Sequence, residues 1–273
     1  MPSVADVTDP AALLAEVKAA APAAVVHLAA ISSVTDSIAD PGTTWAVNTI
    51  GTVNLAEVVR RAAPEARLLV VSSGEVYGDT GDAPAPESRP LAPRSPYAAS
   101  KAAAELAAEQ AARAHGLDVV IARPFAHTGP GHDRRFALPS WAEQIAELER
   151  EGGGELKVGD LTVQRDLLDV RDVVAAYLAL LDPAVPAGTY NVARGEALPL
   201  ADVLALLVGA ASAPISVVRD PARMRAVDTP LLCGDATRLR AATGWKPRYA
   251  LAETLADLLG AARQSVIGDT PRR

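Results

Sequence analysis

Three short apolar runs, each followed by a segment with helical spacing, constrain the fold of this 273-residue chain most strongly. The runs are Ala24 to Ala30, Arg67 to Ser72 and Asp118 to Arg123. Helices are predicted between them, over 43–63 and over 96–115, and Gly116 supplies a C-terminal stop for the second one. Because strands that alternate with helices are typical of a parallel sheet, the sequence predicts a doubly wound α/β fold.

The pattern loosens after Pro124, where shorter apolar runs alternate with helical segments. Strands are predicted near 156–158, 165–169, 189–192 and 215–218, and helices near 139–150, 172–181, 200–211 and 251–267. We therefore expect a first domain over 1–125 and a smaller α/β lobe over 126–273, with some segments of the latter returning to the sheet. Ligands of open parallel sheets bind beyond the carboxyl ends of the strands. The loops after Ala30, Ser73 and Arg123 should thus meet at one cleft.

Composition excludes several classes of protein. The net charge of −7 and the pI near 5.2 give no basic footprint, so no nucleic-acid partner is expected. The single cysteine, Cys233, excludes an internal disulfide and suits a reducing compartment. No stretch approaches the roughly 20 apolar residues of a membrane span, and the start has no signal-peptide pattern. We expect a cytoplasmic protein without membrane contact. His127 and His132 alone make no metal site.

A possible catalytic group follows the second and third predicted strands. Ser72-Ser73-Gly74-Glu75-Val76-Tyr77-Gly78 comes directly after one strand, and Ser95-Pro96-Tyr97-Ala98-Ala99-Ser100-Lys101 opens the next helix. Tyr97 and Lys101 are four apart and share a helical face. A lysine ammonium beside a tyrosine hydroxyl would lower the phenol pKa toward neutrality and make it a general acid or base. The alternative is a Tyr and Lys pair on a solvated helix face.

These motifs resemble the NAD-dependent epimerase/dehydratase family, the extended short-chain dehydrogenases. The matching stretches are His27-Leu28-Ala29-Ala30, Val47-Asn48-Thr49-Ile50-Gly51-Thr52, the Ser73 stretch, Tyr97-x-x-x-Lys101 and Arg123-Pro124-Phe125. The resemblance implies a Rossmann-type sheet with a nicotinamide cofactor on the first domain and a nucleotide sugar under the second lobe. It also implies Ser73, Tyr97 and Lys101 as the catalytic trio. The resemblance further assigns the cofactor to Asp6, Val7, Leu28, Ala29, Ala30, Asn48, Tyr97, Lys101, Arg123 and Phe125.

Within that family, three later stretches look most like GDP-4-keto-6-deoxymannose reductases and GDP-mannose 4,6-dehydratases. They are 123–132, 158–174 and 220–230. By resemblance, Arg165 and Arg225 would face the diphosphate and Asp228 the ribose, with His127 and Val158 also binding substrate. Guanidinium groups can grip phosphate oxygens bidentately. For Arg165 and Arg171, ion pairing with Asp166, Asp169 or Asp172 is the alternative. For Asn48, the alternatives are holding backbone or water near the site and a solvated side chain.

One departure from the family concerns the cofactor. Enzymes of this kind bind pyrophosphate at a glycine-rich strand-to-helix turn, and this chain has no such turn. Its first strand-helix-strand unit is predicted to be missing. The residue that separates NAD from NADP falls in that unit, so either cofactor is expected, NADP before NAD.

A second departure concerns the reaction. Sugar-nucleotide dehydratases of the family tend to follow the catalytic Ser or Thr with Asp-Glu or Ser-Glu, whereas Gly74-Glu75 follows Ser73 here. Glu75 can act as a base, but position 74 offers no acid, so a reductase is preferred to a dehydratase or a 4-epimerase. A non-catalytic sugar-nucleotide-binding protein is the alternative of another class. The resemblance also implies a homodimer through the two long helices.

Overall fold

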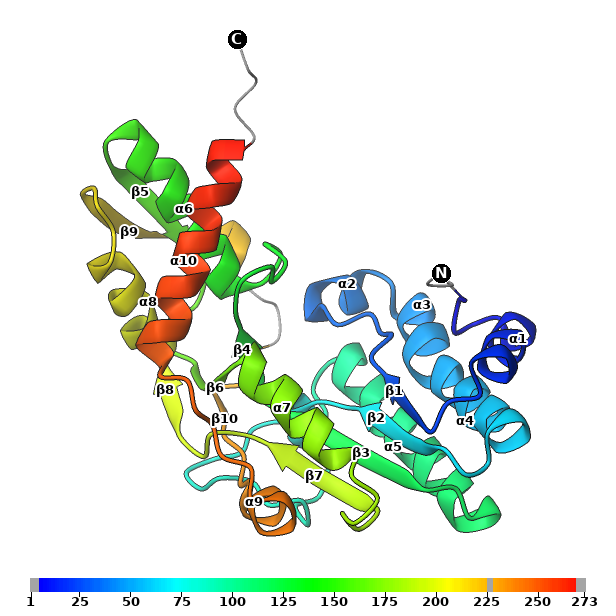
Figure 1. Ribbon diagram of the computed structural model, residues 1–273. Coiled ribbons are helices and arrows are strands. Elements are labelled where there is room, and N and C mark those ends of the chain that lie inside the picture. Colours follow the sequence, from blue (N-terminus) through cyan, green and yellow to red (C-terminus); the bar gives the residue numbers. More distant parts are fainter. Residues whose placement is uncertain (1–4, 225–227, 269–273) are drawn as a thin grey trace.

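The computed structural model describes residues 5–224 and 228–268, which form two lobes (Figure 1). The first lobe contains a four-stranded sheet in the order β1 (Ala24–His27), β2 (Arg67–Val71), β3 (Val119–Pro124) and β7 (Gly188–Val192). Every neighbouring pair is parallel, with registers such as His27↔Val70 and Val71↔Ala122. The predicted parallel α/β fold is confirmed. The strand expected over 189–192 belongs to this sheet, so it is a segment of 126–273 that returns to the first lobe, as expected for some of them.

Alternating side chains of the central strands make the two cores of the first lobe. Leu68 and Val70 of β2 pack with α4 (Gly51–Ala62) and α5 (Pro96–His115) on one face of the sheet. Leu69, between them, packs on the other face with α7 (Val170–Leu180). Because successive strand side chains point to opposite faces, a continuous apolar strand requires cover on both sides.

Helix α5 spans 20 residues, as predicted, and local sequence explains both of its ends. Ser95 caps it by accepting a hydrogen bond from the Ala98 N–H at 3.1 Å, and Pro96 occupies the first helical turn. Gly116 closes it in the left-handed conformation, with φ of 71°. The serine cap therefore fixes Tyr97 in the first turn of α5.

The helix expected over 43–63 is continuous in space but contains a wider turn. It consists of α3 (Pro41–Trp45), the π-helical turn η1 (Ala46–Ile50) and α4. Such turns place an extra residue in the helix and are frequent at functional sites. Here the turn carries Asn48, which is buried.

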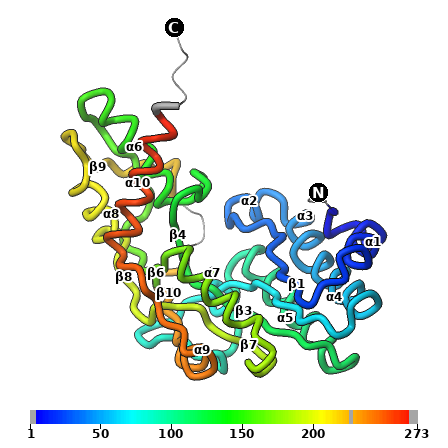
Figure 2. The backbone as a smooth tube through the Cα atoms, viewed as in Figure 1, coloured from blue at the N-terminus to red at the C-terminus, as the bar shows by residue number. Residues whose placement is uncertain are grey.

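The second lobe contains two further small sheets. One has the order β10 (Leu231–Leu232), β6 (Gln164–Asp169) and β4 (Ala126–Thr128), with β8 (Ala197–Pro199) antiparallel to β6. The other pairs β5 (Gly154–Val158) with β9 (Ile215–Arg219). The long helices α6 (Ala137–Glu151) and α10 (Leu251–Gly268) run side by side and share an apolar core with α8 (Leu200–Gly209) (Figure 2).

Several short elements were not predicted. They are α1 (Pro10–Ala20), α2 (Val34–Ala39), α9 (Thr237–Thr243), the 3-10 turns η2 (Gly74–Tyr77) and η3 (Pro221–Arg223), and strands β4, β8 and β10. For α1 the sequence did carry a signal, since Asp9 accepts hydrogen bonds from the N–H groups of Ala11 and Ala12 and Pro10 follows it.

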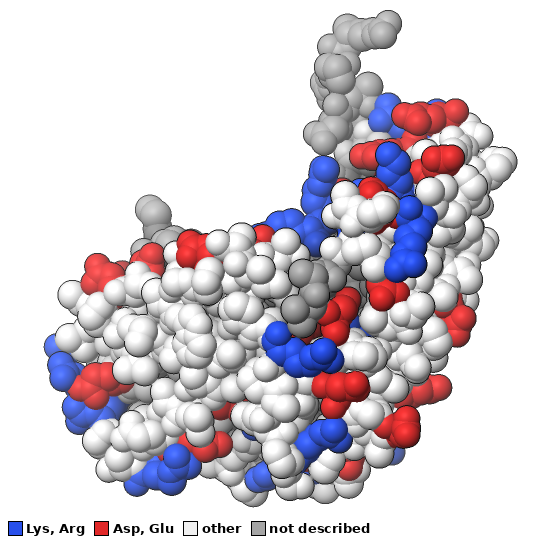
Figure 3. All heavy atoms as spheres, turned by 180° about the vertical axis from the view of Figure 1, so that it is seen from behind, with Lys and Arg blue, Asp and Glu red and all other residues white. Residues whose placement is uncertain are grey.

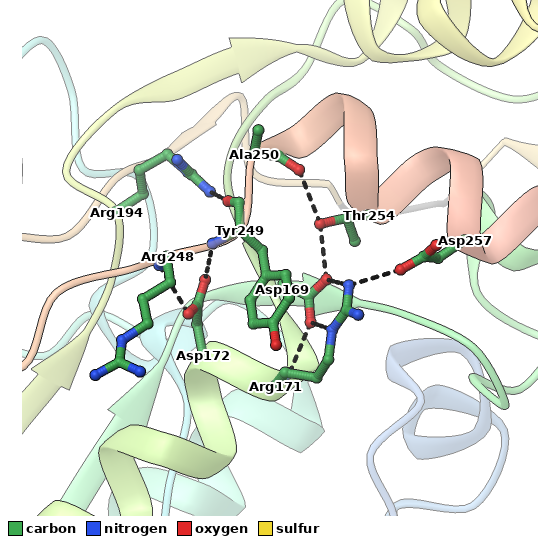
Figure 4. A network of polar contacts seen from close by, with 9 residues as sticks. All are labelled: Asp169, Arg171, Asp172, Arg194, Arg248, Tyr249, Ala250, Thr254 and Asp257. Carbon is green, nitrogen blue, oxygen red and sulfur yellow. Dashed lines mark hydrogen bonds and ion pairs between the residues drawn. The ribbon is translucent and has the colours of Figure 1, made fainter.

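A polar network ties α7, at the crossover between the lobes, to the C-terminal segment (Figure 4). Asp169 ends β6 and pairs with Arg171 at 2.7 Å, and it also accepts a hydrogen bond from the hydroxyl of Thr254. Arg171 reaches Asp257 of α10 at 2.8 Å and stacks on Tyr249. The alternative of ion pairing, raised for Arg171, is thus what the structure shows.

The single cysteine lies in another buried cluster. Asp166 of β6 is fully buried and accepts hydrogen bonds from the backbone N–H groups of Arg194, Gly195 and Gly234. The thiol of Cys233 donates to the same carboxylate, with 3.7 Å between sulfur and oxygen. This carboxylate therefore joins β6 to the segments that follow β7 and β10.

The charged side chains of one face are of mixed sign. On the side turned away from the viewer in Figure 1, acidic and basic side chains of the described residues are interspersed (Figure 3). Within residues 5–224 and 228–268, no helix has the length and apolar character needed to cross a membrane.

Truncating the centre of the sheet tests this packing. Leu69→Ala should lower the free energy of unfolding by about 2–5 kcal/mol, because Leu69 is fully buried and its removal leaves a cavity. Leu178→Ala, at a side chain of α7 that is 64% exposed, should change it by less than about 0.5 kcal/mol. Urea unfolding followed by circular dichroism measures both, and equal losses would contradict the assignment of the core.

Candidate active site

A cavity of about 830 Å³ opens between the lobes, beyond the carboxyl ends of β2 and β3. Ser73, Tyr97 and Phe125 line it from the first lobe. The second lobe contributes mainly the loop before α6, the end of β5 and the segment after β9. The predicted cleft therefore exists, and the expected catalytic residues Ser73, Glu75 and Tyr97 lie together in its wall.

Ser73 occupies the junction between β2 and the turn η2. Its hydroxyl caps the turn by accepting a hydrogen bond from the Glu75 N–H at 3.1 Å, and it is also hydrogen-bonded to Tyr97. Gly74 has no room for a side chain, because a Cβ there would lie 2.9 Å from the ring of Phe125. The serine hydroxyl and the tyrosine hydroxyl are thus held next to each other at the cavity wall.

The pKa of Tyr97 differs from the expectation. Burial raises the pKa of Tyr97 to about 12, the hydrogen bond with Ser73 lowers it, and the negative charge of Glu75 raises it again. The predicted lowering by Lys101 is wrong for the structure as it stands. Residue spacing shows that a lysine can lie near the tyrosine, but it does not show how far the whole fold buries the tyrosine hydroxyl, and this burial raises the pKa.

Lys101 lies one turn below Tyr97 on α5 and is only 5% exposed. Its ammonium donates a hydrogen bond to the Val71 carbonyl oxygen at 2.7 Å. Burial lowers the pKa of Lys101 to about 8, while Glu105 acts to raise it. An ammonium carries three N–H donors, and among the described residues the Val71 carbonyl is its one hydrogen-bond acceptor, so donors remain for hydroxyl groups of a ligand.

Asn48 joins the loop after β1 to α5. Its side-chain oxygen accepts from the Ile31 N–H at 2.8 Å, and its amide donates to the Ile31 carbonyl at 3.0 Å and to the Ser100 hydroxyl at 2.9 Å. Asn48 is 1% exposed, so the alternative of a solvated asparagine does not hold. It fixes backbone next to the helix that carries Tyr97.

Of the other residues expected at the cofactor, one lines the cavity and the rest lie outside its wall. Leu28 and Ala29 are exposed just past β1, with Ala30 half-buried beside them. Asp6 accepts hydrogen bonds from the backbone and hydroxyl of Thr8, and Val7 packs against Gly51. Phe125 lines the cavity, whereas the residues of 6–7 and 28–30 lie outside its wall.

Arg123 is not available to a cofactor in this structure, contrary to expectation. It is 5% exposed and forms an ion pair with Glu105, with 2.6 Å between Nη2 and Oε2. Its guanidinium also donates to the Tyr77 hydroxyl at 2.7 Å. The side chain points into the lobe because Glu105 and Tyr77 are its partners there.

The expected substrate residues are partly brought together. His127, Arg165 and Asp228 line the cavity. Arg165 and Asp228 form an ion pair with each other at 2.5 Å, so a ligand that binds either side chain would have to join this ion pair or break it. Val158 instead lies in the core of the second lobe with 1% exposure, and its neighbours Gly159 and Asp160 line the cavity. Arg225 lies outside the described residues.

Sequence reasoning missed several cavity residues. Ser32, Arg134, Arg135 and Arg223 all line the cavity. Arg135 forms an ion pair of 2.6 Å with Asp36 of α2, which closes one edge of the cavity. The adjacent arginines after Gly131 were the available signal. Among the residues described, no group of three or more His, Cys, Asp or Glu side chains can hold a metal ion.

The residues present fit the nicotinamide end of a dinucleotide. The Tyr97 and Ser73 hydroxyls line the cleft at the carboxyl edge of a parallel sheet, where such sheets bind ligands, and the Lys101 ammonium is bound to Val71, the last residue of β2. The loop between β1 and α2 contains no glycine, so the described residues do not form the glycine-rich turn that holds pyrophosphate. Sheet order, cleft and the Ser73, Tyr97 and Lys101 arrangement define an extended short-chain dehydrogenase/reductase.

The chain belongs to the GDP-mannose 4,6-dehydratase family, whose model matches residues 3–258. It is 39% identical over 241 residues to GDP-6-deoxy-D-mannose reductase of Pseudomonas aeruginosa, covering 87% of this chain and 79% of that protein. It is 34% identical to UDP-glucose 4-epimerase of Mycolicibacterium smegmatis, covering 89% and 76%. The structure of RMD from Pseudomonas aeruginosa complexed with NADPH superposes with a TM-score of 0.90 at 35% identity, covering 97% and 89%.

Removing the Asn48 side chain tests its role in the site. Asn48→Ala should lower the free energy of unfolding by about 2–3 kcal/mol, because it removes three hydrogen bonds made by a fully buried side chain, two with Ile31 and one with Ser100. Asn54→Ala is the control, since Asn54 is half-buried and its amide donates a hydrogen bond to the Val7 carbonyl at 3.0 Å. Thermal and urea unfolding measure both variants. A smaller loss for Asn48→Ala than for Asn54→Ala would contradict this account.

Proposed function

We propose that this protein catalyses NAD(P)H-dependent reduction of a GDP-4-keto-6-deoxyhexose to the GDP-6-deoxyhexose. The observation that carries the proposal is that Ser73 and Tyr97 lie together in the wall of a cleft large enough for a sugar nucleotide, with Lys101 buried one turn beyond Tyr97 on the same helix. The likeness to GDP-6-deoxy-D-mannose reductase supports the choice of substrate. In this proposal the sheet lobe, residues 1–125 with β7, binds the cofactor, and the lobe over 126–273 binds the sugar nucleotide.

The chemistry needs one hydride and one proton. When bound, the reduced nicotinamide supplies the hydride to C4 of the sugar, so that the C=O bond becomes a C–O single bond. Tyr97 gives its hydroxyl proton to the carbonyl oxygen and is reprotonated from solvent, and Ser73 holds that oxygen by a hydrogen bond. With a pKa near 12, Tyr97 is protonated at neutral pH and suited to act as the acid. Lys101 would hold hydroxyl groups of the cofactor through the ammonium donors that Val71 does not use.

The packing around Gly74 supports reduction over dehydration. Dehydration in this family is expected to require an acid next to the catalytic serine, and position 74 is filled by the ring of Phe125. The same ring contacts Gly234 from its other side, since a Cβ on Gly234 would lie 2.2 Å from it. An acidic side chain at 74 would have to displace a ring held between two glycines. Glu75 remains the candidate base for a dehydratase activity.

Arginines of the cavity would bind the diphosphate. Arg165 and Arg223 lie in the wall of the second lobe, and Arg134 and Arg135 lie at the rim before α6. His127 lines the wall and donates through Nδ1 to the Phe125 carbonyl at 3.0 Å, so its other ring nitrogen can accept from a ligand. Asp228, beside Arg165, is assigned to the ribose and Arg225 to the diphosphate.

The cofactor is proposed to be NADPH, which the solved relative from Pseudomonas aeruginosa contains in complex, and the setting is proposed to be the cytoplasm. Leu28, Ala29, Ala30 and Asn48 are assigned to its binding surface, together with Lys101. Asp6 and Val7 would lie beside the adenine.

Replacing the tyrosine hydroxyl tests the proposed reaction. Tyr97→Phe should lower kcat by about 10²–10⁴-fold, because it removes the general acid. Tyr249→Phe is the control, since the Tyr249 ring stacks on Arg171 outside the cavity. NADPH oxidation at 340 nm with GDP-4-keto-6-deoxymannose measures the rate, and chromatography identifies the product. Full activity of Tyr97→Phe would refute the role of the hydroxyl, and turnover of GDP-mannose with NADP would favour a dehydratase.

We also propose that two copies associate through the face formed by α3, η1, α4 and α5. Four large apolar side chains are exposed there: Trp45 at 40%, Ile50 at 52%, Val53 at 43% and Leu106 at 60%. Exposed apolar side chains gathered on one face are typical of an association surface. Two copies facing each other would bury the two long helices of each.

Light scattering after size exclusion tests the association. Wild-type protein should elute at twice the chain mass of 28.2 kDa, and Ile50→Glu with Leu106→Glu should elute at the chain mass, because buried unpaired carboxylates oppose association. Val174→Glu with Leu178→Glu, on the exposed side of α7, is the control. A wild-type monomer would contradict the proposed dimer.

A further inference from the structure

A buried carboxylate connects the elements that carry the proposed catalytic residues. Glu105 lies on α5 one turn beyond Lys101 and is 1% exposed. Its Oε1 accepts a close hydrogen bond from the Ser72 hydroxyl at the end of β2. The same oxygen accepts from Arg123 Nε of β3 at 2.9 Å, and Oε2 accepts from Nη2 at 2.6 Å. One side chain thus joins α5, β2 and β3.

The guanidinium of Arg123 continues this connection to the far end of the Ser73 loop. It donates to the Tyr77 hydroxyl at 2.7 Å and to the Glu87 carbonyl at 3.2 Å. The Tyr77 hydroxyl in turn donates to Asn191 of β7 at 2.8 Å. Since Ser72 precedes Ser73 and Tyr77 ends η2, both ends of the loop are held by one ion pair.

The charge of Glu105 also reaches Lys101. Side chains four apart on a helix are neighbours, and the described titratable groups that act on or respond to Lys101 are Glu105 on its own helix and His27 on β1. Burial lowers the pKa of Lys101 and the carboxylate of Glu105 opposes this. For His27, burial and then Lys101 lower the pKa to about 4, so this ring is neutral at neutral pH.

We propose that Glu105 is a positioning residue of the active site, which fixes the Ser73 loop against α5 through Ser72 and Arg123 and supplies the negative charge that faces the Lys101 ammonium. This inference rests on the proposed function, because the loop and the ammonium act only in that reaction. Two buried charges are costly unless fully paired, and apolar side chains could fill the same space. This pair bonds to both ends of the serine loop and places a negative charge one turn from Lys101, so it does more than fill space.

The chain is well suited to a direct test of the charge. It has four lysines, of which Lys18, Lys157 and Lys246 are exposed and Lys101 is buried, and burial lowers the pKa of Lys101 to about 8. NMR titration of protein labelled with carbon-13 at the lysine Cε measures each midpoint, and Lys101→Arg assigns the resonance. Glu105→Gln should lower the Lys101 midpoint by about one pH unit, because it removes the facing negative charge.

The matched control is Glu109→Gln. Glu109 lies one turn further along α5 and pairs with Arg113 on the surface at 3.1 Å, so its replacement should leave the midpoint unchanged. In the NADPH assay, the decline of kcat at high pH should move down in Glu105→Gln by the same amount as the NMR midpoint. Glu105→Asp keeps the charge and should restore the midpoint. An unchanged Lys101 midpoint in folded Glu105→Gln would overturn the proposal.

A second variant separates the positioning role from the charge. Ser72→Ala keeps both charges and removes the hydrogen bond to Glu105, so it should lower kcat by about tenfold with KM and the Lys101 midpoint unchanged. If Ser72→Ala has the wild-type kcat, the positioning role of Glu105 is contradicted. This test does not depend on whether Glu105→Gln folds. If wild-type protein oxidises no NADPH, the proposed function fails, whereas the NMR midpoints still decide the role of Glu105.

Discussion

The carboxylate of Glu105 and the guanidinium of Arg123 lie 2.6 Å apart at a place where almost no water reaches either group. An ion pair in such surroundings is favourable only where further hydrogen bonds satisfy the remaining donors and acceptors. Ser72, Tyr77 and the Glu87 carbonyl provide them. The requirement for complete pairing therefore holds the ends of β2 and β3, the helix α5 and the turn η2 in one arrangement. The positions of Tyr97 and Ser73 in the cleft depend on this arrangement, because Tyr97 lies on α5 and Ser73 joins β2 to η2.

Much of the first lobe could be predicted from the sequence, because its signals are local. A serine cap, a proline in the first turn and a closing glycine give both ends of α5. Apolar runs identify the strands, and alternation with helices makes the sheet parallel. The π-helical turn around Asn48 could not be predicted, because it depends on hydrogen bonds to Ile31 and Ser100, which are distant in sequence. Nor could the sequence identify which segment of 126–273 returns to the first sheet, because that depends on how the lobes are connected.

The cavity shows the same division between local and distant causes. Spacing placed Ser73 and Tyr97 together, and both line the cavity. The same reasoning gave the wrong direction for the pKa of Tyr97, because burial and Glu75 act on it and neither follows from spacing. Arg123 ends a strand at the right edge, yet its partners draw it inward. Val158 is one residue away from the wall, since successive residues of a strand face opposite sides.

The thiol of Cys233, which lies beside Asp166, allows local opening of the second lobe to be measured by chemical modification. Burial raises the pKa of Cys233 to about 12, and the neighbouring carboxylate adds to this, so the reactive thiolate is scarce while the cluster is intact. Alkylation then proceeds only as fast as the segments around β6, β7 and β10 separate from one another. Because the sequence has one cysteine, the rate of thiol modification reports the rate at which these segments open locally, without a contribution from any other site.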